Sequence, residues 1–265
     1  MPMTSPSAAA RAAYEYNSSS RLNRTTNRTG QPVQEKLKQR RYEIAYLNQN
    51  GDFVETTIQA PTLAQFEDAF GALGRGAILQ TQNGPMAVED LLPGDQIRMA
   101  NGMYEKLLWR GSMTIQPEDA NANPETSSLI RIMADALGPQ KPAPDVVLGP
   151  TARLIHKSNG VKALTGARAA FIPARDFVDG NQFIALRPAA PVRVYQLGFA
   201  DHQRLSVNGI IIESLHPGTS FSLGLRGDVL AQYLALFPHK ANLADFGTLH
   251  NPRLRLRDLD IFEAG

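Results

Sequence analysis

The chain has 265 residues, of which 43% are hydrophobic and 20% are charged, and these proportions are typical of a globular protein. No apolar run approaches the roughly 18 residues of a membrane span, and no continuous apolar segment near the N-terminus indicates a secretory signal peptide, so we expect a cytoplasmic protein. The absence of cysteine excludes disulfides, thiolate zinc sites and cysteine nucleophiles, and the five histidines show no pair at metal-ligand spacing. We therefore expect neither a metal nor another cofactor.

The basic residues concentrate at the N-terminus. Residues 1–40 carry seven Lys or Arg and two Asp or Glu, a net charge of +5, so the remaining residues carry −3. Residues 1–39 have few large apolar side chains and cannot bury enough surface to offset the entropy cost of ordering, which predicts a disordered basic tail. An arm that binds nucleic acid is the alternative, but charges spread this thinly form a weak electrostatic footprint and favour a solvated tail.

Two alternating segments, 42–47 and 53–58, flank Asn50-Gly51 and predict a β-hairpin. Thr62 is then a candidate cap for a short helix, with Gln65 completing a capping box. The apolar side chains of that helix fall at helical spacing, at Leu63, Phe66 and Phe70.

The pair Asn-Gly is a strong turn signal between apolar segments, because both residues tolerate positive φ. It occurs five times, at residues 50–51, 83–84, 101–102, 159–160 and 208–209. Five such turns predict a mostly β protein. Residues 116–128 and 138–145 are predicted loops, and 128–136 fits either a strand or a short helix.

Beyond residue 218 the pattern becomes helical. Asp228–Phe237 carries its apolar side chains on one side and ends at Pro238, which predicts an amphipathic helix. Residues 253–263 carry basic side chains first and acidic side chains after them, and they are a candidate final helix.

The stretch 76–95 reads Gly-x-Ile-Leu-x-Thr-x-x-Gly-x-x-x-Val-Glu-Asp-Leu-x-Pro-Gly-Asp. This string resembles the opening block of the Hint module shared by hedgehog proteins and inteins, and it is most similar to bacterial Hint-domain proteins. In that family the block begins with a Cys that performs the chemistry, and the matching residue here is Ala72.

Two further blocks follow in the family's order. Residues 148–153 are similar to a Leu-Ser-Pro-x-His-Arg block, with Ala152 at the position of its His, and His156 lies four residues too late to replace it. The last block keeps some of the family's residues and has others replaced. The retained ones are Asp201, His202, Asn208 and Gly209, and the changed ones are Glu213 and Ser214, which stand where splicing members have His-Asn.

The resemblance implies an all-β, horseshoe-shaped Hint fold with an N-terminal β-hairpin and short peripheral helices. The domains it implies are a disordered basic tail at 1–39, the hairpin and helix at 40–69, the Hint domain at 70–218 and a helical extension at 219–265. In the reaction that it implies, a side chain attacks the preceding carbonyl and a His protonates the leaving nitrogen. No catalytic set is intact here, since those positions hold Ala72 and Ala152.

The sequence leaves three functions open. The first is a structural or binding module without autoprocessing, with a protein partner that the sequence does not name. The second is a residual self-cleaving protein that cuts near Gly71, and the third is a nucleic-acid-associated protein that uses the basic tail. His202 is either a residual acid–base group beside Asp201 or a partly buried side chain that holds a turn, and the second reading is favoured because no nucleophile is present.

Overall fold

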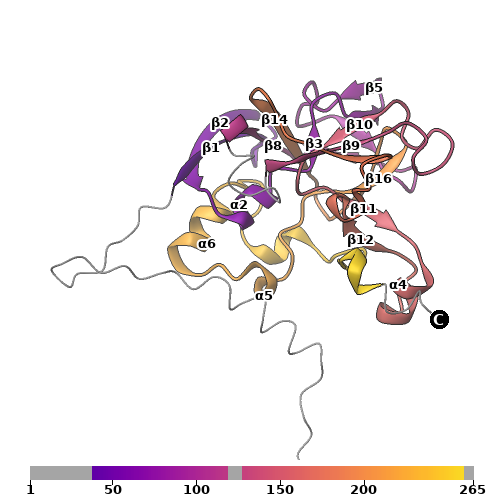
Figure 1. Ribbon diagram of the computed structural model, residues 1–265. Coiled ribbons are helices and arrows are strands. Elements are labelled where there is room, and N and C mark those ends of the chain that lie inside the picture. Colours follow the sequence, from indigo (N-terminus) through magenta and orange to yellow (C-terminus); the bar gives the residue numbers. More distant parts are fainter. Residues whose placement is uncertain (1–37, 119–126, 260–265) are drawn as a thin grey trace, which may run out of the picture. The chain divides into compact units, whose positions relative to one another are not determined.

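Two antiparallel β-sheets form the body of the protein in this computed structural model, and short helices lie at their periphery (Figure 1). The structure describes residues 38–118 and 127–259. The predicted disordered tail therefore lies outside the described residues, except for its last two, and Gln39 already begins the first strand.

The first sheet has the strand order β13-β9-β10-β3-β14-β8-β1-β2. Its strands are β1 (Gln39–Leu47), β2 (Phe53–Pro61), β3 (Leu73–Gly74), β8 (Trp109–Ile115), β9 (Leu129–Ile132), β10 (Val146–Leu148), β13 (Phe183–Leu186) and β14 (Val192–Gly198). The predicted N-terminal hairpin, β1–β2, is confirmed and extends this sheet because β1 pairs with β8. The undecided segment 128–136 forms the strand β9.

The second sheet has the order β12-β11-β16-β15-β4-β6-β7, and β5 pairs with β4 beside it. Its strands are β4 (Ile78–Thr81), β5 (Gly84–Ala87), β6 (Gln96–Arg98), β7 (Tyr104–Lys106), β11 (Arg153–His156), β12 (Ala170–Pro173), β15 (Arg204–Val207) and β16 (Ile210–Glu213). The predicted mostly β architecture is thus confirmed.

Four of the five predicted Asn-Gly turns are present. They connect β1 to β2, β4 to β5, β6 to β7 and β15 to β16. At the last of them Asn208 and Gly209 have φ of 48° and 86°, as a type I′ turn requires. The fifth prediction is wrong, because Asn159-Gly160 opens a helix whose preceding residue, Ser158, accepts a hydrogen bond from the Val161 amide.

The described helices are short. They are α2 (Ala64–Asp68), α4 (Asn159–Thr165), α5 (Ser220–Leu223), α6 (Gly227–Leu234) and the 3₁₀ turns η2 (Ala174–Phe177), η3 (Leu243–Phe246) and η4 (Leu256–Asp258). Helix α2 is where the sequence places it, but the predicted Thr62 cap is wrong: Leu63 occupies the N-cap position, and the Thr62 hydroxyl donates to the Lys38 carbonyl. The predicted final helix is likewise reduced to η4 among the residues described there.

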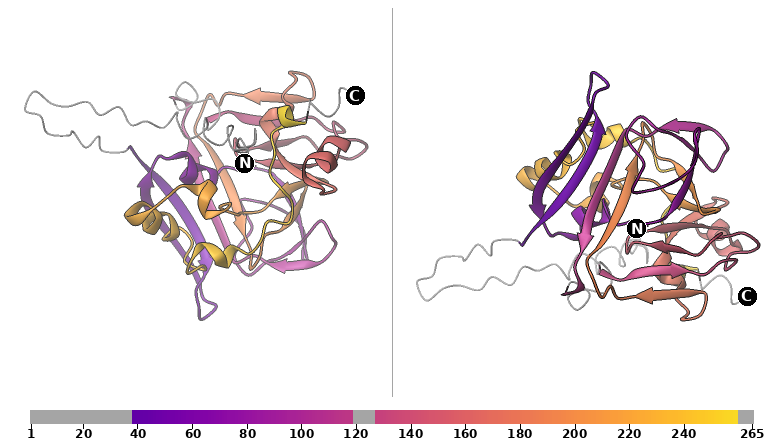
Figure 2. Two further views of the ribbon diagram at one scale, coloured as in Figure 1. Left: turned by 90° about the horizontal axis from the view of Figure 1, so that it is seen from below. Right: turned by 90° about the horizontal axis from the view of Figure 1, so that it is seen from above.

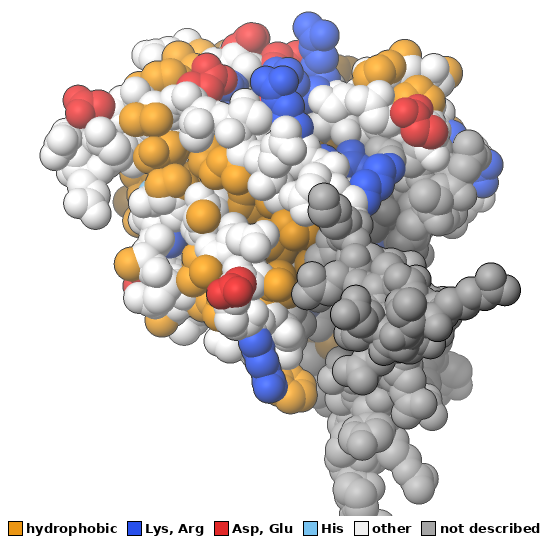
Figure 3. All heavy atoms as spheres, turned by 90° about the vertical axis from the view of Figure 1, so that its left-hand side faces the viewer, with side chains coloured by type: hydrophobic (Ala, Val, Ile, Leu, Met, Phe, Trp, Pro, Cys, Tyr) orange, Lys and Arg blue, Asp and Glu red, His pale blue; other side chains and the backbone are white. Residues whose placement is uncertain are grey.

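Trp109 organises the core that joins the first sheet to the C-terminal helices. Its ring is fully buried against Phe70 and Phe237, and its indole N–H donates to the Leu236 carbonyl at 2.9 Å. Hydrophobic side chains also gather on the outer side where β2 and α6 lie (Figure 3). The hairpin and the C-terminal extension therefore share one core with the central strands.

A segment at the C-terminus, residues 247–259, runs from these helices to the edge of the second sheet (Figure 2). There it adds two backbone hydrogen bonds to edge strand β12, from the Phe171 amide to the Pro252 carbonyl and from the Leu254 amide to the Phe171 carbonyl. We call it the C-terminal segment below. No helix among the described residues is long and apolar enough to cross a membrane.

Candidate functional site

The backbone of the peptide bond between Gly71 and Ala72, the bond to which the resemblance assigns the chemistry, is tightly held. The Gly71 carbonyl accepts a hydrogen bond from the Thr151 amide at 3.0 Å. The Ala72 amide donates to the Tyr195 carbonyl at 3.1 Å, and the Ala72 carbonyl accepts from the Gly149 amide at 2.9 Å. Residues 149–151 and strand β14 thus fix both sides of this peptide.

Gly149 approaches that peptide more closely than any larger residue could. A Cβ atom built on Gly149 would lie 2.1 Å from the Gly71 carbonyl oxygen and 2.7 Å from its carbon. Contacts of this length to backbone atoms do not occur in real structures, so the position requires glycine in this arrangement. The Ser of the Leu-Ser-Pro-x-His-Arg block, which the resemblance aligns with Gly149, would not fit here.

Ala72 and Ala152 are both buried, with 1% and 0% exposure, and belong to the same hydrophobic cluster. Their methyl groups can neither attack a carbonyl nor move a proton. His156 does not replace Ala152, because it lies further along β11, where its ring packs 5.6 Å from that of Phe177.

A second group of family positions forms a buried charge cluster around Glu213, which is 3% exposed. The Arg253 Nε atom donates to both carboxylate oxygens of Glu213, at 2.9 and 3.1 Å. The Arg153 guanidinium lies 3.5 Å from the same Glu213 carboxylate, and its other terminal nitrogen lies 4.0 Å from the carboxylate of Asp68. Arg153 directly follows Ala152 in the sequence, so the charge cluster adjoins that position along the chain.

The environment of Glu213 favours its ionised form. Burial opposes ionisation, but the contact with His202 and the positive charges of Arg253 and Arg153 outweigh it and lower the pKa of Glu213 to about 2. Burial also lowers the pKa of Arg253, although the carboxylate opposes this shift. Glu213 is therefore a permanent anion at neutral pH.

His202 is fully buried inside this cluster rather than partly buried at a turn. Its Nδ1 atom accepts a hydrogen bond from the His250 amide at 3.0 Å, so the proton of the neutral ring resides on Nε2. Nε2 lies 3.2 Å from Glu213 Oε1. The side chain thus fastens the C-terminal segment, while the neighbouring Asp201 is exposed.

His216 and His250 complete the surroundings of His202, with ring centroids 5.2 and 5.4 Å from its own. His216 accepts from the Gly218 amide through Nδ1 and contacts the Gly247 carbonyl through Nε2 at 3.1 Å. Burial lowers the pKa of His216 to about 4, and burial is also the main reason why the pKa of His250 is lowered. His216 and His250 are therefore uncharged at neutral pH and add no charge to the cluster.

The remaining family positions have structural roles. The Ser214 hydroxyl is buried and accepts from the Gln203 amide at 2.8 Å. The Asn208 side-chain oxygen accepts from the Ile78 amide at 2.8 Å, joining the β15–β16 turn to β4. Gly209 has positive φ, and a Cβ there would lie 2.6 Å from the Gln140 carbonyl oxygen.

Sequence reasoning missed the partners of these positions, namely Arg253, His216 and His250. The only available signal was Glu213 itself, at the end of the apolar run Ile210–Ile212. A carboxylate buried at such a position requires a positively charged partner. The sequence does not reveal that this partner lies 40 residues further along the chain.

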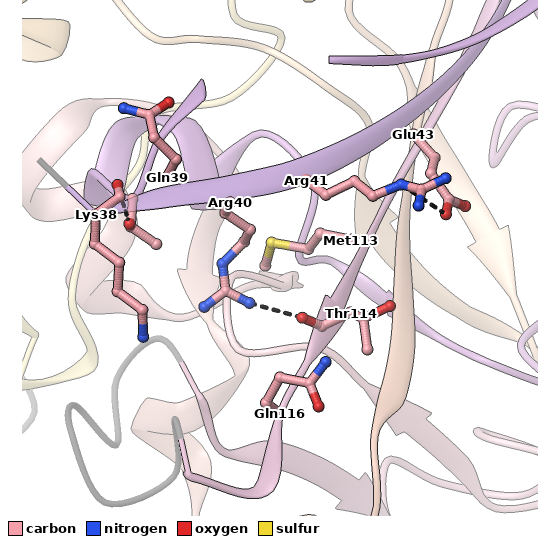
Figure 4. Close-up of a pocket in the computed structure, with 9 residues that line it drawn as sticks. Lys38, Gln39, Arg40, Arg41, Glu43, Met113, Thr114 and Gln116 are labelled. Carbon is pink, nitrogen blue, oxygen red and sulfur yellow. Dashed lines mark hydrogen bonds and ion pairs between the residues drawn. The ribbon is translucent and has the colours of Figure 1, made fainter. Parts of the chain in front are cut away.

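A basic cavity of about 350 Å³ lies beside β1 and β8, lined by Arg40, Arg41 and Glu43 among others (Figure 4). Arg40 donates to the Thr114 carbonyl at 2.6 Å and lies 3.0 Å from Glu67, so its charge is used within the fold. Among the residues that the structure describes, no group of three His, Asp or Glu side chains is arranged to hold a metal ion.

Comparison with known proteins gives one family and several distant structures. The model of the Hint domain matches residues 72–219, more than half of the chain. A bacterial intein-like domain from Clostridium thermocellum is similar with a TM-score of 0.38 and 12% identity, over 55% of this chain and 99% of that domain. The MchDnaB-1 intein has a TM-score of 0.34 and 15% identity, over 54% of this chain and all of the intein. No curated protein sequence matches the chain.

Proposed function

This chain belongs to the Hint domain family, and we propose that it is a non-processing member whose Hint domain serves as a structural or binding module. The observation that carries the proposal is the Gly71–Ala72 peptide. Its carbonyl accepts from the Thr151 amide, a contact suited to a developing oxyanion. The side chains at the two chemical positions are nevertheless methyl groups, at Ala72 and Ala152.

The missing groups cannot be supplied by the residues nearest to them. Thr151, the neighbour of Ala152, has its hydroxyl close to Gly71, but this hydroxyl donates to the Asp68 carbonyl at 3.2 Å. A hydroxyl without a base to remove its proton is a weak nucleophile. His202 belongs to the Glu213 cluster, where its Nδ1 atom already accepts from the His250 amide.

The second bond that splicing members break also lacks its chemistry here. Ser214 stands where the resemblance places an Asn, and its hydroxyl accepts from the Gln203 amide. Glu213 precedes it in place of a His and is held as an anion by Arg253. A carboxylate with a pKa of about 2 cannot donate a proton to a leaving group near neutral pH.

The module that we propose includes its flanking segments. The hairpin of residues 40–69 extends the first sheet through β1 and β8, and the extension of residues 219–265 covers Trp109. A fragment limited to residues 70–218 would expose that core, so the Hint domain of this chain is expected to need both flanks for full stability.

Intact-mass measurement of the full-length protein tests the proposal. The protein is incubated with and without dithiothreitol and sampled over days. We expect one species at the mass of the whole chain, 28.9 kDa. A growing species with the mass of residues 72–265 would refute the non-processing function. Loss of that species in the Thr151→Ala variant would identify its hydroxyl as the nucleophile.

Restoring the two absent groups gives a positive control. Ala72→Cys supplies a thiol, and Ala152→His supplies the general acid, which is typically worth about 10²–10⁴-fold. Since the peptide between Gly71 and Ala72 is already held, we expect slow thiol-dependent cleavage after Gly71 in the double variant. Neither single variant should cleave, because each lacks one of the two roles.

A further inference from the structure

Strand β2 ends the first sheet and leaves one side of its backbone open. It pairs with β1 over all nine of its residues, and within the described parts of the chain no segment pairs with its other side. The hairpin lies at the outer margin of the sheet (Figure 2). An open edge presents a row of unpaired amide and carbonyl groups, which is a template for another strand.

The sequence of β2 does little to protect this edge. Natural sheets protect open edges with lysines, prolines or bulges. The only charged side chain of β2 is Glu55, and its only proline is its last residue, Pro61. The register with β1 has no bulge, since it runs without a break from Pro61 opposite Gln39 to Phe53 opposite Leu47. This edge is therefore long, regular and suited to pairing.

Alternation along the hairpin determines which backbone groups of β2 face outward. In an antiparallel pair of strands, hydrogen-bonded and non-bonded residue pairs alternate. Leu47 lies opposite Phe53, but its amide donates to the Leu108 carbonyl on the other side of β1. The pair of Leu47 and Phe53 is thus non-bonded, and the backbone groups of Phe53 point away from β1. Every second residue does the same, so the outward-facing amides belong to Phe53, Glu55, Thr57 and Gln59.

These positions are self-complementary when two copies of β2 lie antiparallel about a two-fold axis at Thr56. Phe53 then lies opposite Gln59 of the partner subunit, and Glu55 lies opposite Thr57 of the partner subunit. Each of these pairs joins two outward-facing residues. The four pairs together form about eight backbone hydrogen bonds, two for each pair.

Neighbouring registers are less complementary. An axis at Thr57 would place Phe53 opposite Pro61 of the partner subunit, which has no amide to donate. An axis at Glu55 would place two carboxylates directly opposite each other, which is destabilising. With the axis at Thr56 the two Glu55 side chains are diagonal to each other, and no outward-facing amide lies opposite a proline.

The side chains favour the same register. Arg41 on β1 reaches across to β2, where its guanidinium donates to the Thr57 hydroxyl at 3.4 Å. Because Thr57 lies opposite Glu55 of the partner subunit, each Arg41 guanidinium meets an exposed carboxylate across the axis. On the other face of the strand, Val54 meets Ile58 of the partner subunit, and both side chains are half-buried in the single chain. Opposite charges and apolar side chains are thus both matched.

We propose that two copies of this chain associate through β2 and join their first sheets into one continuous sheet. A two-fold symmetric dimer is the commonest assembly of identical chains, and its interface uses the same surface of both copies. The backbone hydrogen bonds supply affinity, and the Arg41–Glu55 pairs fix the register. The dimer uses none of the Hint positions and does not depend on whether the chain processes itself.

Sedimentation velocity of the full-length protein measures the association. We expect a species of 28.9 kDa at low concentration and one of twice that mass at high concentration. An interface of one strand from each subunit is at the small end of the range for specific complexes, so we expect a Kd on the order of 10 μM.

Exchanging the charges tests the pairing of Arg41 with Glu55. Arg41→Glu should weaken association at least roughly five-fold, because it places like charges across the axis. Combining Arg41→Glu with Glu55→Arg restores opposite charges and should restore association. Lys162→Glu makes the same change of charge at an exposed position of α4 and should have no effect.

A cysteine at the two-fold axis tests the register, since the chain has no cysteine of its own. Thr56→Cys places two thiols on a directly opposed, non-bonded pair, whose Cα atoms lie about 4.5 Å apart and within the range of a disulfide. Oxidation with copper phenanthroline should therefore link Thr56→Cys chains into a covalent dimer. Thr57→Cys is the matched control, because its two copies are diagonal at about 7–8 Å and should not be linked.

Three outcomes would overturn the inference. They are a protein that stays monomeric well above the expected Kd, equal cross-linking at the two cysteine positions, and a charge exchange that does not restore association. Sedimentation of the unmodified protein needs no variant, so it does not depend on whether a substitution disturbs folding.

Discussion

The Glu213→Gln variant tests the buried charge cluster most directly. The substitution keeps the shape of the side chain and removes its charge, leaving Arg253 and Arg153 next to a neutral amide. The pKa of Glu213 falls from 4.5 to about 2 in the folded protein. Such a lowering of the pKa corresponds to roughly 3 kcal/mol, at about 1.4 kcal/mol for each tenfold change in the acid constant. Breaking a buried ion pair by removing one partner typically costs about 3–5 kcal/mol, which agrees.

Urea denaturation at pH 7, followed by the fluorescence of the single buried Trp109, measures this loss. We expect the free energy of unfolding to fall by about 3 kcal/mol in Glu213→Gln. Glu89→Gln is the matched control, because Glu89 pairs with Arg75, whose side chain is 76% exposed. Such a surface pair contributes about 0–1 kcal/mol, so the control should change little.

The pH dependence of the same difference separates charge from shape. The folded pKa of Glu213 lies below its unfolded value, so its stabilising contribution is complete above pH 4.5 and disappears as the pH falls towards 2. The difference between wild type and Glu213→Gln should shrink over that range. The charge of the carboxylate would not stabilise the cluster if the two free energies of unfolding differed by less than about 0.5 kcal/mol at pH 7, or by an amount independent of pH.

Three further predictions concern other parts of the structure. Gly149→Ala should destabilise the protein by about 2–3 kcal/mol in urea denaturation, because its Cβ would overlap the Gly71 carbonyl; Gly71→Ala meets only side-chain atoms at 3.2 Å and should cost less. The wild-type protein should lose stability as the pH falls from 6.5 to 4, since the lowered pKa of His216 means that the unfolded chain binds its proton first; His216→Gln should flatten that part of the profile, and an unchanged profile would contradict the assignment. Asn208→Ala should lower the urea midpoint by an amount corresponding to about 1–3 kcal/mol, because the Ile78 amide would lose its side-chain acceptor.

Local turn chemistry explains how much of the fold the sequence predicts. Asn-Gly pairs between short apolar runs identify four hairpins, because only residues that tolerate positive φ can close such turns. Asn159-Gly160 fails because Ser158 provides a hydrogen-bond acceptor for the Val161 amide and starts a helix instead. The same dipeptide thus serves two structures, and the preceding residue decides between them.

The sequence likewise predicts one part of the candidate site and not the other. The order of the family's blocks predicts Ala72 and Ala152 as the two chemical positions, and both belong to the same buried cluster. The contact between Gly149 and the Gly71 carbonyl depends on backbone approach across two segments 78 residues apart. The partnership of Glu213 with Arg253 likewise depends on the path of the C-terminal segment. Spacing and periodicity carry no information about either contact.

The positions of the first cleavage, Ala72 and Ala152, have different surroundings from Glu213, a position of the second cleavage. Ala72 and Ala152 lie among apolar side chains, and the backbone around them is already paired, so restoring a thiol and an imidazole there removes no existing interaction. Glu213 instead anchors Arg253 and, through it, the C-terminal segment. A histidine at position 213 would leave the Arg253 guanidinium buried without its anion, at a cost of several kcal/mol. Restoring the second cleavage would therefore require changing Arg253 as well, whereas the first requires only Ala72 and Ala152.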